Sequence, residues 1–375
     1  MSEVVVITGA SAGVGRATVR AFAKRKASVA LIARDTEGLE AAAEEVKAAG
    51  GRALPLPVDV ADADAVESAA ERVESQLGPI DIWINVAMAT IYAPLHRIAP
   101  EEYRRATEVT YLGNVYGTMA ALKRMRPRNR GTIVQVGSAL AYRAIPLQAP
   151  YCGAKFAIRG FTDSLRSELL HDRINIHLTM VQMPALNTPQ FDWGRNKLSK
   201  RPQPVPPIFQ PEVAAEAIVF AAYACRREVW VGGPAIKAIL ANKIAPGLLD
   251  RYLARDGYSG QLSAEPADPA APDNLFEPVP GDHGAHGRFD KRATPWSAAL
   301  WASMHKGSLL AGGAVAGLAL LTAALAVHRN DAAQQPRVHV EPRGPFRLHA
   351  IRPVRSRLGR GPACDAVGCR QGRGV

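Results

Sequence analysis

The chain has 375 residues, 47% of them hydrophobic, which is enough for one large folded domain with appended segments. Its formal net charge of +12 is unevenly spread, because residues 329–375 hold ten arginines against three acidic residues and so contribute +7. The rest of the chain carries only +5, which gives no indication of a nucleic-acid partner. No such partner is predicted for the tail either, since residues 351–375 have no aromatic side chains between the arginines.

Short apolar runs alternate with longer amphipathic stretches over the first 230 or so residues, which is the pattern of a parallel sheet wrapped by helices. Strands are predicted at Val4–Ile7, Ser28–Ala33, Arg52–Pro57, Ile80–Asn85, Gly131–Gly137, Ile174–Met180 and Glu228–Val231. Helices are predicted at 13–26, 36–49, 62–77, 101–126, 151–171 and 211–225. We therefore expect a Rossmann-type, doubly wound α/β domain of about seven strands in residues 1–255.

Two segments depart from this alternation. Residues 184–209 contain six prolines and follow the end of a predicted strand, so they are either a lid over a substrate or a plain surface loop. Residues 256–305 are rich in Pro, Gly and Asp and are predicted to be a linker. His283 and His286 in that stretch are interpreted as exposed loop histidines rather than a metal-ligand pair.

The segment Ser308–Val327 has twenty residues without a charge, and a helix of that length spans the hydrocarbon layer of about 30 Å. It predicts a single transmembrane helix, with a basic, disordered tail at 328–375. Because no secretory signal is visible, we expect the domain in residues 1–255 on the cytoplasmic side of that membrane. Cys364 and Cys369 in the tail lack a matching second pair of ligands, so no metal site is predicted.

A glycine-rich turn, Thr8-Gly9-Ala10-Ser11-Ala12-Gly13-Val14-Gly15, lies directly after the first strand and opens a helix. In this context Gly9 permits a tight turn, Gly13 allows the backbone to approach a pyrophosphate, and Gly15 allows the helix to pack on the strand. The pyrophosphate would lie at the positive end of the helix. The pattern predicts a dinucleotide site.

Arg34 follows the second strand, at the point where a carboxylate would bind the ribose 2′-hydroxyl of NAD. A guanidinium there can pair with a 2′-phosphate, so the sequence favours NADP(H) over NAD(H). Asp35 is interpreted as the N-cap of the next helix.

Ser138, Tyr151 and Lys155 form the predicted reactive set. Ser138 follows a strand, and Tyr151 and Lys155 lie one turn apart on one face of the next helix. An ammonium beside a phenol favours the phenolate, so Lys155 is expected to lower the pKa of Tyr151, while Ser138 orients a substrate oxygen. A Y-x3-K pair alone is more often an ordinary helix-face pair, but here it accompanies Ser138 and the glycine turn.

Together these motifs resemble the short-chain dehydrogenase/reductase superfamily in its single-domain form, over about Val4 to Gly232. The region from Phe191 to Gly281 also resembles a bacterial subgroup with an extended C-terminus. The resemblance implies that Asn114 supports a proton-relay water. It also implies a set of cofactor contacts, at Thr8, Gly9, Ser11, Gly13, Val14, Gly15, Arg34, Asp59, Val60, Asn85, Ala87, Tyr151, Lys155, Pro184 and Thr188.

Two departures from the family pattern stand out: its N-N-A-G segment after the fourth strand appears as Asn85-Val86-Ala87-Met88, and Ala185 follows Pro184 where glycine is usual. Neither belongs to the proton-transfer set, so the resemblance implies an oxidoreductase that transfers hydride between nicotinamide and a carbonyl or alcohol. The predicted membrane segment favours an apolar substrate, such as a lipid, steroid or long-chain carbonyl compound. A homo-oligomer is compatible with the family. The alternative function is a membrane-tethered, cofactor-binding sensor or scaffold with little turnover.

Overall fold

The computed structural model of the chain describes residues 2–309, 315–318 and 320–323. They belong to two compact units, residues 1–313 and 314–375, and all the elements named below lie in the first. The basic tail predicted at 328–375, with Cys364 and Cys369, lies outside the described residues.

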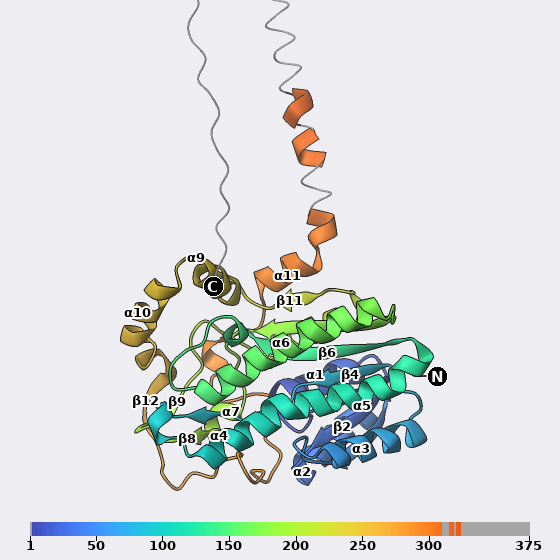
Figure 1. The fold of residues 1–375 in the computed structure, drawn as a ribbon, viewed down its shortest axis with the longest axis horizontal. Coiled ribbons are helices and arrows are strands. Elements are labelled where there is room, and N and C mark those ends of the chain that lie inside the picture. The colour runs from blue at the N-terminus through green and yellow to red at the C-terminus, as the bar shows by residue number, and fades with distance from the viewer. Residues whose placement is uncertain (1, 310–314, 319, 324–375) are drawn as a thin grey trace, which may run out of the picture. The chain divides into compact units, whose positions relative to one another are not determined.

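A seven-stranded parallel sheet forms the centre of the first unit (Figure 1). Its strands are β1 (Val4–Thr8), β2 (Ser28–Ala33), β3 (Arg52–Pro57), β4 (Ile82–Asn85), β6 (Gly131–Ser138), β7 (Ile176–Met183) and β11 (Glu228–Trp230). The strand order is β11-β7-β6-β4-β1-β2-β3, and every neighbouring pair is parallel. The direction of winding reverses between β1 and β4, which confirms the predicted doubly wound, Rossmann-type sheet.

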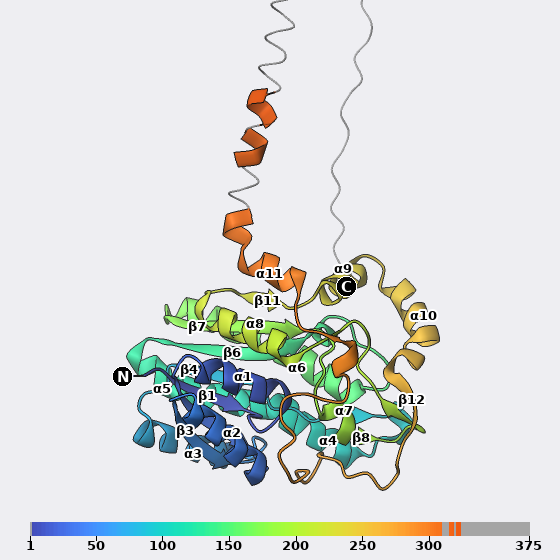
Figure 2. The same cartoon turned by 180° about the vertical axis from the view of Figure 1, so that it is seen from behind.

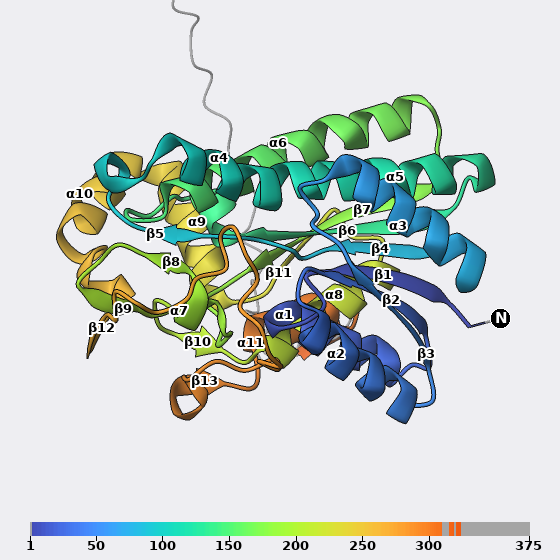
Figure 3. The same ribbon diagram turned by 90° about the horizontal axis from the view of Figure 1, so that it is seen from below.

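Helices cover both faces of this sheet, as the edge-on view in Figure 3 shows. On one face lie α3 (Ala63–Gln76), α4 (Pro100–Thr107), α5 (Gly113–Arg128) and α6 (Ala149–His171). On the other lie α1 (Gly13–Ala23), α2 (Thr36–Ala48), α8 (Pro211–Tyr223) and α11 (Ala298–Met304), which the reverse view in Figure 2 shows in front. Asp35 caps α2, as expected, by accepting a 2.7 Å hydrogen bond from the Gly38 amide.

The alternating side chains of β1 explain why its sequence is a continuous apolar run. Val5 and Ile7 belong to the core cluster under α1, α2 and α8, whereas Val4 and Val6 belong to the cluster under α3, α5 and α6. A strand covered on both faces needs apolar residues at every position. The core therefore consists of two apolar layers separated by the sheet.

The single helix predicted at 101–126 is three consecutive pieces. After α4 the backbone widens into one π-helical turn, Glu108–Leu112, before α5 continues to Arg128. A π-turn adds a residue to the helix without changing its hydrophobic period enough to be visible in the sequence.

Several short elements occupy the segments where the sequence predicts a lid and a linker. Residues 184–209 contain α7 (Gln190–Trp193) and strands β8 (Arg195–Asn196), β9 (Lys200–Pro202) and β10 (Ile208–Phe209). Two further helices, α9 (Gly233–Ile244) and α10 (Pro246–Asp256), follow β11. Residues 256–305 contain β12 (Leu262–Pro266), β13 (Ala293–Thr294) and α11, so this segment has more order than the expected linker. The remaining elements of the described residues are β5 (Ile91–Tyr92) and four single 3-10 turns.

The predicted transmembrane helix at 308–327 is wrong for the part of the chain that the structure describes. Across those residues no helix combines the length and the hydropathy needed to cross a bilayer. Within the segment the described residues are 308–309, 315–318 and 320–323, and the others lie outside the description. The membrane location and the cytoplasmic side, which both depended on this helix, are corrected with it.

Candidate functional site

A cavity of about 490 Å³ opens at the carboxyl edge of the sheet, where the winding reverses between β1 and β4. This is the place where doubly wound sheets bind their ligands, and the volume lies within the usual range of about 300–1,000 Å³ for ligand pockets. Its wall contains most of the predicted site residues, namely Gly9, Ser11, Gly13, Val14, Gly15, Arg34, Asp59, Val60, Ala87, Ser138, Tyr151, Lys155, Pro184 and Thr188. The structure therefore brings together residues that lie up to about 180 positions apart in the sequence.

The glycine turn between β1 and α1 has the geometry that only glycine allows. Gly9 and Gly13 have φ values of +67° and +57°, in the left-handed region. A Cβ on Gly15 would lie 1.9 Å from the Gly9 carbonyl oxygen, so α1 and the turn approach too closely for any side chain. The turn is therefore a backbone surface that opens directly into the cavity.

Thr8 and Asn85 support the site without lining it. The Thr8 hydroxyl accepts hydrogen bonds from the amides of Val86 and Ala87, at 3.0 and 3.2 Å, and so fixes the loop that follows β4. Asn85 is 3% exposed, and its side-chain amide donates to Gln135 at 2.9 Å and to other buried groups. Both residues were predicted as cofactor contacts, and the structure places them behind the wall of the cavity.

Arg34 and Asp59 lie at the end of the cavity that is farthest along the sheet, beside β2 and β3. The Arg34 guanidinium donates to the carbonyl oxygens of Asn274 and Phe276, the latter at 2.6 Å. Burial lowers the pKa of Arg34, but a guanidinium stays protonated at neutral pH. The Asp59 carboxylate pairs with Arg105 and accepts from the Ala61 amide at 3.0 Å.

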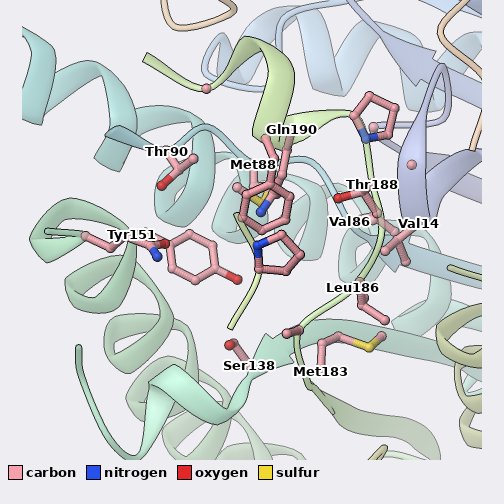
Figure 4. Close-up of a pocket in the computed structure, with 18 of the residues that line it drawn as sticks. Val14, Val86, Met88, Thr90, Ser138, Tyr151, Met183, Leu186, Thr188 and Gln190 are labelled. Atoms are coloured by element: carbon pink, nitrogen blue, oxygen red, sulfur yellow. The ribbon is translucent and has the colours of Figure 1, made fainter. Parts of the chain in front are cut away.

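At the end of the cavity away from Arg34 and Asp59, three predicted residues come together, namely Ser138, Tyr151 and Lys155. Ser138 ends β6, and the tyrosine and lysine come from the first turns of α6. Figure 4 shows the oxygens of Ser138 and Tyr151 turned toward one another. The Lys155 ammonium lies 5.4 Å from the centre of the Tyr151 ring and donates to the Val136 carbonyl at 2.6 Å. A hydroxyl pair and a buried cation thus face one region of the cavity.

Burial dominates the electrostatics of this group. It raises the pKa of Tyr151 to about 12, against a smaller lowering by Ser138. It also lowers the pKa of Lys155 to about 8. The lysine was expected to lower the tyrosine pKa, but the net shift is upward, because desolvation of the phenolate outweighs the lowering by the Ser138 hydrogen bond. At neutral pH the tyrosine therefore holds its proton.

Asn114 is buried beside the π-helical turn and does not line the cavity. Its backbone carbonyl accepts from the Thr118 hydroxyl at 2.7 Å, whereas its side-chain carbonyl oxygen has no hydrogen-bond partner among the described residues. A buried acceptor without a partner is uncommon in native proteins and is often found near functional sites. The π-turn before it widens the helix at this point, as such turns frequently do at functional sites.

Comparison with known proteins decides the family. Residues 3–193, about half of the chain, match the family described as short chain dehydrogenase. The chain is a short-chain dehydrogenase/reductase.

Relatives of this dehydrogenase share different portions of its length. The Bacillus subtilis (strain 168) protein named "Uncharacterized oxidoreductase YxnA" is 31% identical over 86% of this chain and 90% of its own. The Danio rerio protein named 3-dehydrosphinganine reductase is 33% identical over 50% of this chain and 57% of its own. A solved short-chain dehydrogenase from Streptomyces avermitilis has a TM-score of 0.56 at 26% identity, covering 68% of this chain and 95% of its own.

Membership of the family makes this short-chain dehydrogenase an oxidoreductase that acts on CH–OH groups with a nicotinamide cofactor. The residues present fit such a cofactor. The glycine turn offers bare backbone at the N-terminus of α1, and a side chain on Gly9 would collide with Ala87 at 2.9 Å. This cradle is the kind of surface that receives a pyrophosphate.

The cavity of the dehydrogenase also contains residues that the sequence did not indicate. Thr90 is 2% exposed, and its hydroxyl has no partner among the described residues. Figure 4 shows it with Met88 and Gln190 on the side of the cavity opposite Ser138. Met88 and Ala185, which stand where the family has glycine, both line the cavity. Nothing in the local pattern around Thr90 distinguishes it from a buried loop threonine, so sequence reasoning had no signal to find it.

Proposed function

We propose that this enzyme uses NADPH to reduce the carbonyl group of an apolar substrate. The observation that carries the proposal is the meeting of Ser138, Tyr151 and Lys155 in the cavity whose far end contains Arg34. The backbone of the glycine turn lines the cavity between the end at Tyr151 and the end at Arg34. One extended dinucleotide can therefore reach both ends of the cavity.

The cofactor, when bound, supplies the hydride. Tyr151 donates its proton to the substrate oxygen as negative charge develops there, which suits a hydroxyl that stays protonated at neutral pH. Ser138 donates a second hydrogen bond to the same oxygen and fixes its orientation. Lys155 is mostly protonated at pH 7, and its charge stabilises the tyrosinate that is left.

Asn114 is proposed to return a proton to this group. Its unpaired side-chain oxygen can hold a water, and a water held there can pass a proton toward Lys155. The buried position of Asn114 supports a structural water as the last carrier of a proton that comes from bulk solvent.

The preference for NADPH is proposed from the charge near Arg34. The second strand ends in Ala33 and not in a carboxylate, and Asp35, the acidic residue that follows Arg34 in the sequence, is engaged as a helix cap. Arg34 faces the cavity as a permanent cation. A 2′-phosphate would pair with it, whereas the 2′-hydroxyl of NADH would find no acceptor at the end of the strand.

An apolar substrate is proposed from the side chains around Tyr151 and Ser138. The same cavity is lined by Met88, Ile145, Met183, Leu186, Phe191 and Val205, and Figure 4 shows Met183 near Ser138. A relative is named for the reduction of 3-dehydrosphinganine. The alternative of a cofactor-binding sensor is not favoured, because the relatives are named as oxidoreductases and reductases.

The decisive variant is Tyr151→Phe, measured by the loss of NADPH absorbance with a panel of long-chain ketones and aldehydes. Because only the acid is removed, kcat is expected to fall by about 10²- to 10⁴-fold while the NADPH dissociation constant stays unchanged. Turnover that persists in this variant would refute the assignment of Tyr151. Absence of NADPH and NADH binding by the unmodified enzyme would refute the function itself.

Arg34→Ala tests the cofactor preference. Loss of one charge-assisted contact is expected to weaken NADPH binding by about 10- to 100-fold and to change NADH binding much less. Both dissociation constants can be measured by titration of cofactor fluorescence. Equal losses for the two cofactors would show that Arg34 supports the site without recognising the 2′-phosphate.

A further inference from the structure

Residues 273–289, here named the C-terminal strap, cross the open side of the cavity after β12. In Figure 3 this light-brown chain passes from the neighbourhood of α7 to that of α1. We propose that the C-terminal strap is the outer wall of the dinucleotide site, and that its displacement limits how fast the cofactor leaves. The proposal rests on the proposed function only in taking the cavity to be the dinucleotide site.

One end of the strap is fixed beside α4 and α7. The Asp273 carboxylate pairs with Arg195 at 2.9 Å, and the Asn274 amide donates to the Trp193 carbonyl at 3.0 Å. Leu275 is completely buried in the core cluster under α3, α5 and α6, and its carbonyl accepts from Arg105 at 3.1 Å. This end is therefore part of the folded core.

The same end of the strap also binds Arg34, the residue that is proposed to distinguish NADPH from NADH. The two carbonyl oxygens that receive the Arg34 guanidinium, those of Asn274 and Phe276, belong to the strap. Arg105 bridges the strap to Asp59, which lines the cavity next to Arg34. The orientation of Arg34 toward a 2′-phosphate thus depends on backbone that is more than 200 residues away in sequence.

The other end of the strap is fixed to the glycine turn. The Gly284 carbonyl accepts from the Gly13 amide at 2.9 Å, and Asp282 pairs at 3.0 Å with Arg16, which is 1% exposed. Beyond it the Phe289 amide donates to the Asn187 side chain at 3.0 Å. The backbone at Gly287 lies so close to Thr188 that a Cβ would be 2.5 Å from its carbonyl oxygen.

The middle of the strap faces the cavity. Pro278, Val279, Gly281 and His283 line it opposite the glycine turn. The His283 ring also packs edge-on against Trp193, with ring centres 4.6 Å apart. A dinucleotide that lies along the glycine turn would therefore be enclosed between that turn and residues 278–283. Such a ligand can leave only after the contacts that fix one end of the strap have broken.

Gly284→Val tests this in the full-length enzyme. Gly284 has φ +61°, and no atom lies within 4 Å of an added Cβ, so the substitution strains the strap without a collision. The NADPH dissociation rate is expected to rise about tenfold, which corresponds to about 1.4 kcal/mol. The KM for NADPH is expected to rise with it, with kcat unchanged or higher. The rate is measured by stopped-flow displacement of fluorescent NADPH.

Gly50→Val is the matched control. Gly50 has φ +84° and equally open surroundings, but it lies between α2 and β3, away from the cavity. It should suffer the same backbone strain and keep the dissociation rate of the unmodified enzyme. If Gly284→Val does not fold, Asp282→Asn weakens the same anchor, with Asp172→Asn, whose partner is Arg126, as its control.

Hydrogen exchange supplies a second measurement. The amides of Val279 and of residues 281–284 should exchange more slowly when NADPH is added to the unmodified enzyme. If NADPH binds, but the strap variants release it at the rate of their controls and these amides are unprotected, the proposal is overturned and the proposed function stands. If the unmodified enzyme binds neither cofactor, the proposed function fails first.

Discussion

Lys155 is a cation held inside the protein at a cost to stability. It is 3% exposed, and burial lowers its pKa from 10.5 to about 8. A difference of about 2.5 pKa units corresponds to about 3 kcal/mol, by which burial disfavours the charged side chain at neutral pH. The ammonium makes one hydrogen bond in return, to the Val136 carbonyl. The proposed role of Lys155 beside Tyr151 would account for a buried cation at this cost.

Lys155→Met is therefore expected to stabilise the enzyme while abolishing turnover. After about 1 kcal/mol is subtracted for the lost hydrogen bond, the gain at pH 7 is about 2 kcal/mol. The unfolded chain binds more protons than the folded one between pH 8 and 10.5, so the stability of the unmodified enzyme rises with pH across that window. The difference in free energy of unfolding between Lys155→Met and the unmodified enzyme should be largest below pH 8 and should shrink toward pH 10.5.

Urea denaturation at pH 7, 9 and 10.5 measures this difference. Lys47→Met is the control, because the Lys47 side chain is 57% exposed and its removal should change stability by less than about 0.5 kcal/mol. A gain for Lys155→Met that does not vary with pH would mean that packing, and not the buried charge, causes it.

At the residue scale the sequence identified residues that line the cavity. It did not show which polar residues face the cavity and which support the backbone behind its wall. The glycine turn, Ser138, Tyr151 and Lys155 carry their chemistry in their spacing, and the structure brings them together. Thr8 and Asn85 were grouped with them, yet they hold the loop after β4 and the buried amide network. Whether a polar side chain faces a ligand or a neighbouring backbone depends on three-dimensional packing, which spacing does not encode.

At the scale of elements, the long regular strands and helices were predictable because burial on both faces leaves a continuous apolar signal. The β1 strand is the clearest case, with its side chains divided between two core clusters. Elements of two to four residues, such as β5, β8 and α7, have too few positions for any period. They form because distant segments meet, as when β5 pairs with β8 across about a hundred residues.

The transmembrane prediction failed at the same scale for a different reason. A run of uncharged residues satisfies a hydropathy window regardless of the backbone that it adopts. In the described part of the chain α11 ends at Met304, with His305 as its cap, before the apolar run begins. The prediction assumed one continuous helix from composition alone, and among the described residues no helix is long and apolar enough to cross a membrane.

At the scale of the whole molecule, the C-terminal segment decides where the folded enzyme ends. The expected catalytic domain stopped at residue 255, but Phe289 is buried against Phe191, and Leu300 on α11 is 1% exposed within the core cluster under α1 and α8. The strap and α11 thus contribute side chains to the same core as the sheet. We expect one cooperative unit that extends to about residue 304.

Leu300→Ala tests that extent. Removing a fully buried leucine side chain leaves a cavity and is expected to lower the free energy of unfolding of the whole enzyme by about 2–5 kcal/mol. Leu309→Ala deletes the same atoms from a side chain that is 46% exposed and should cost less than about 1 kcal/mol. Urea denaturation is followed by far-UV circular dichroism, with NADPH release recorded in parallel. Both signals should shift together in a single transition for Leu300→Ala, because α11 then belongs to the unit that holds the sheet. If NADPH release and the main transition stay where they are in the unmodified enzyme, α11 is an appended helix and the cooperative unit ends before it.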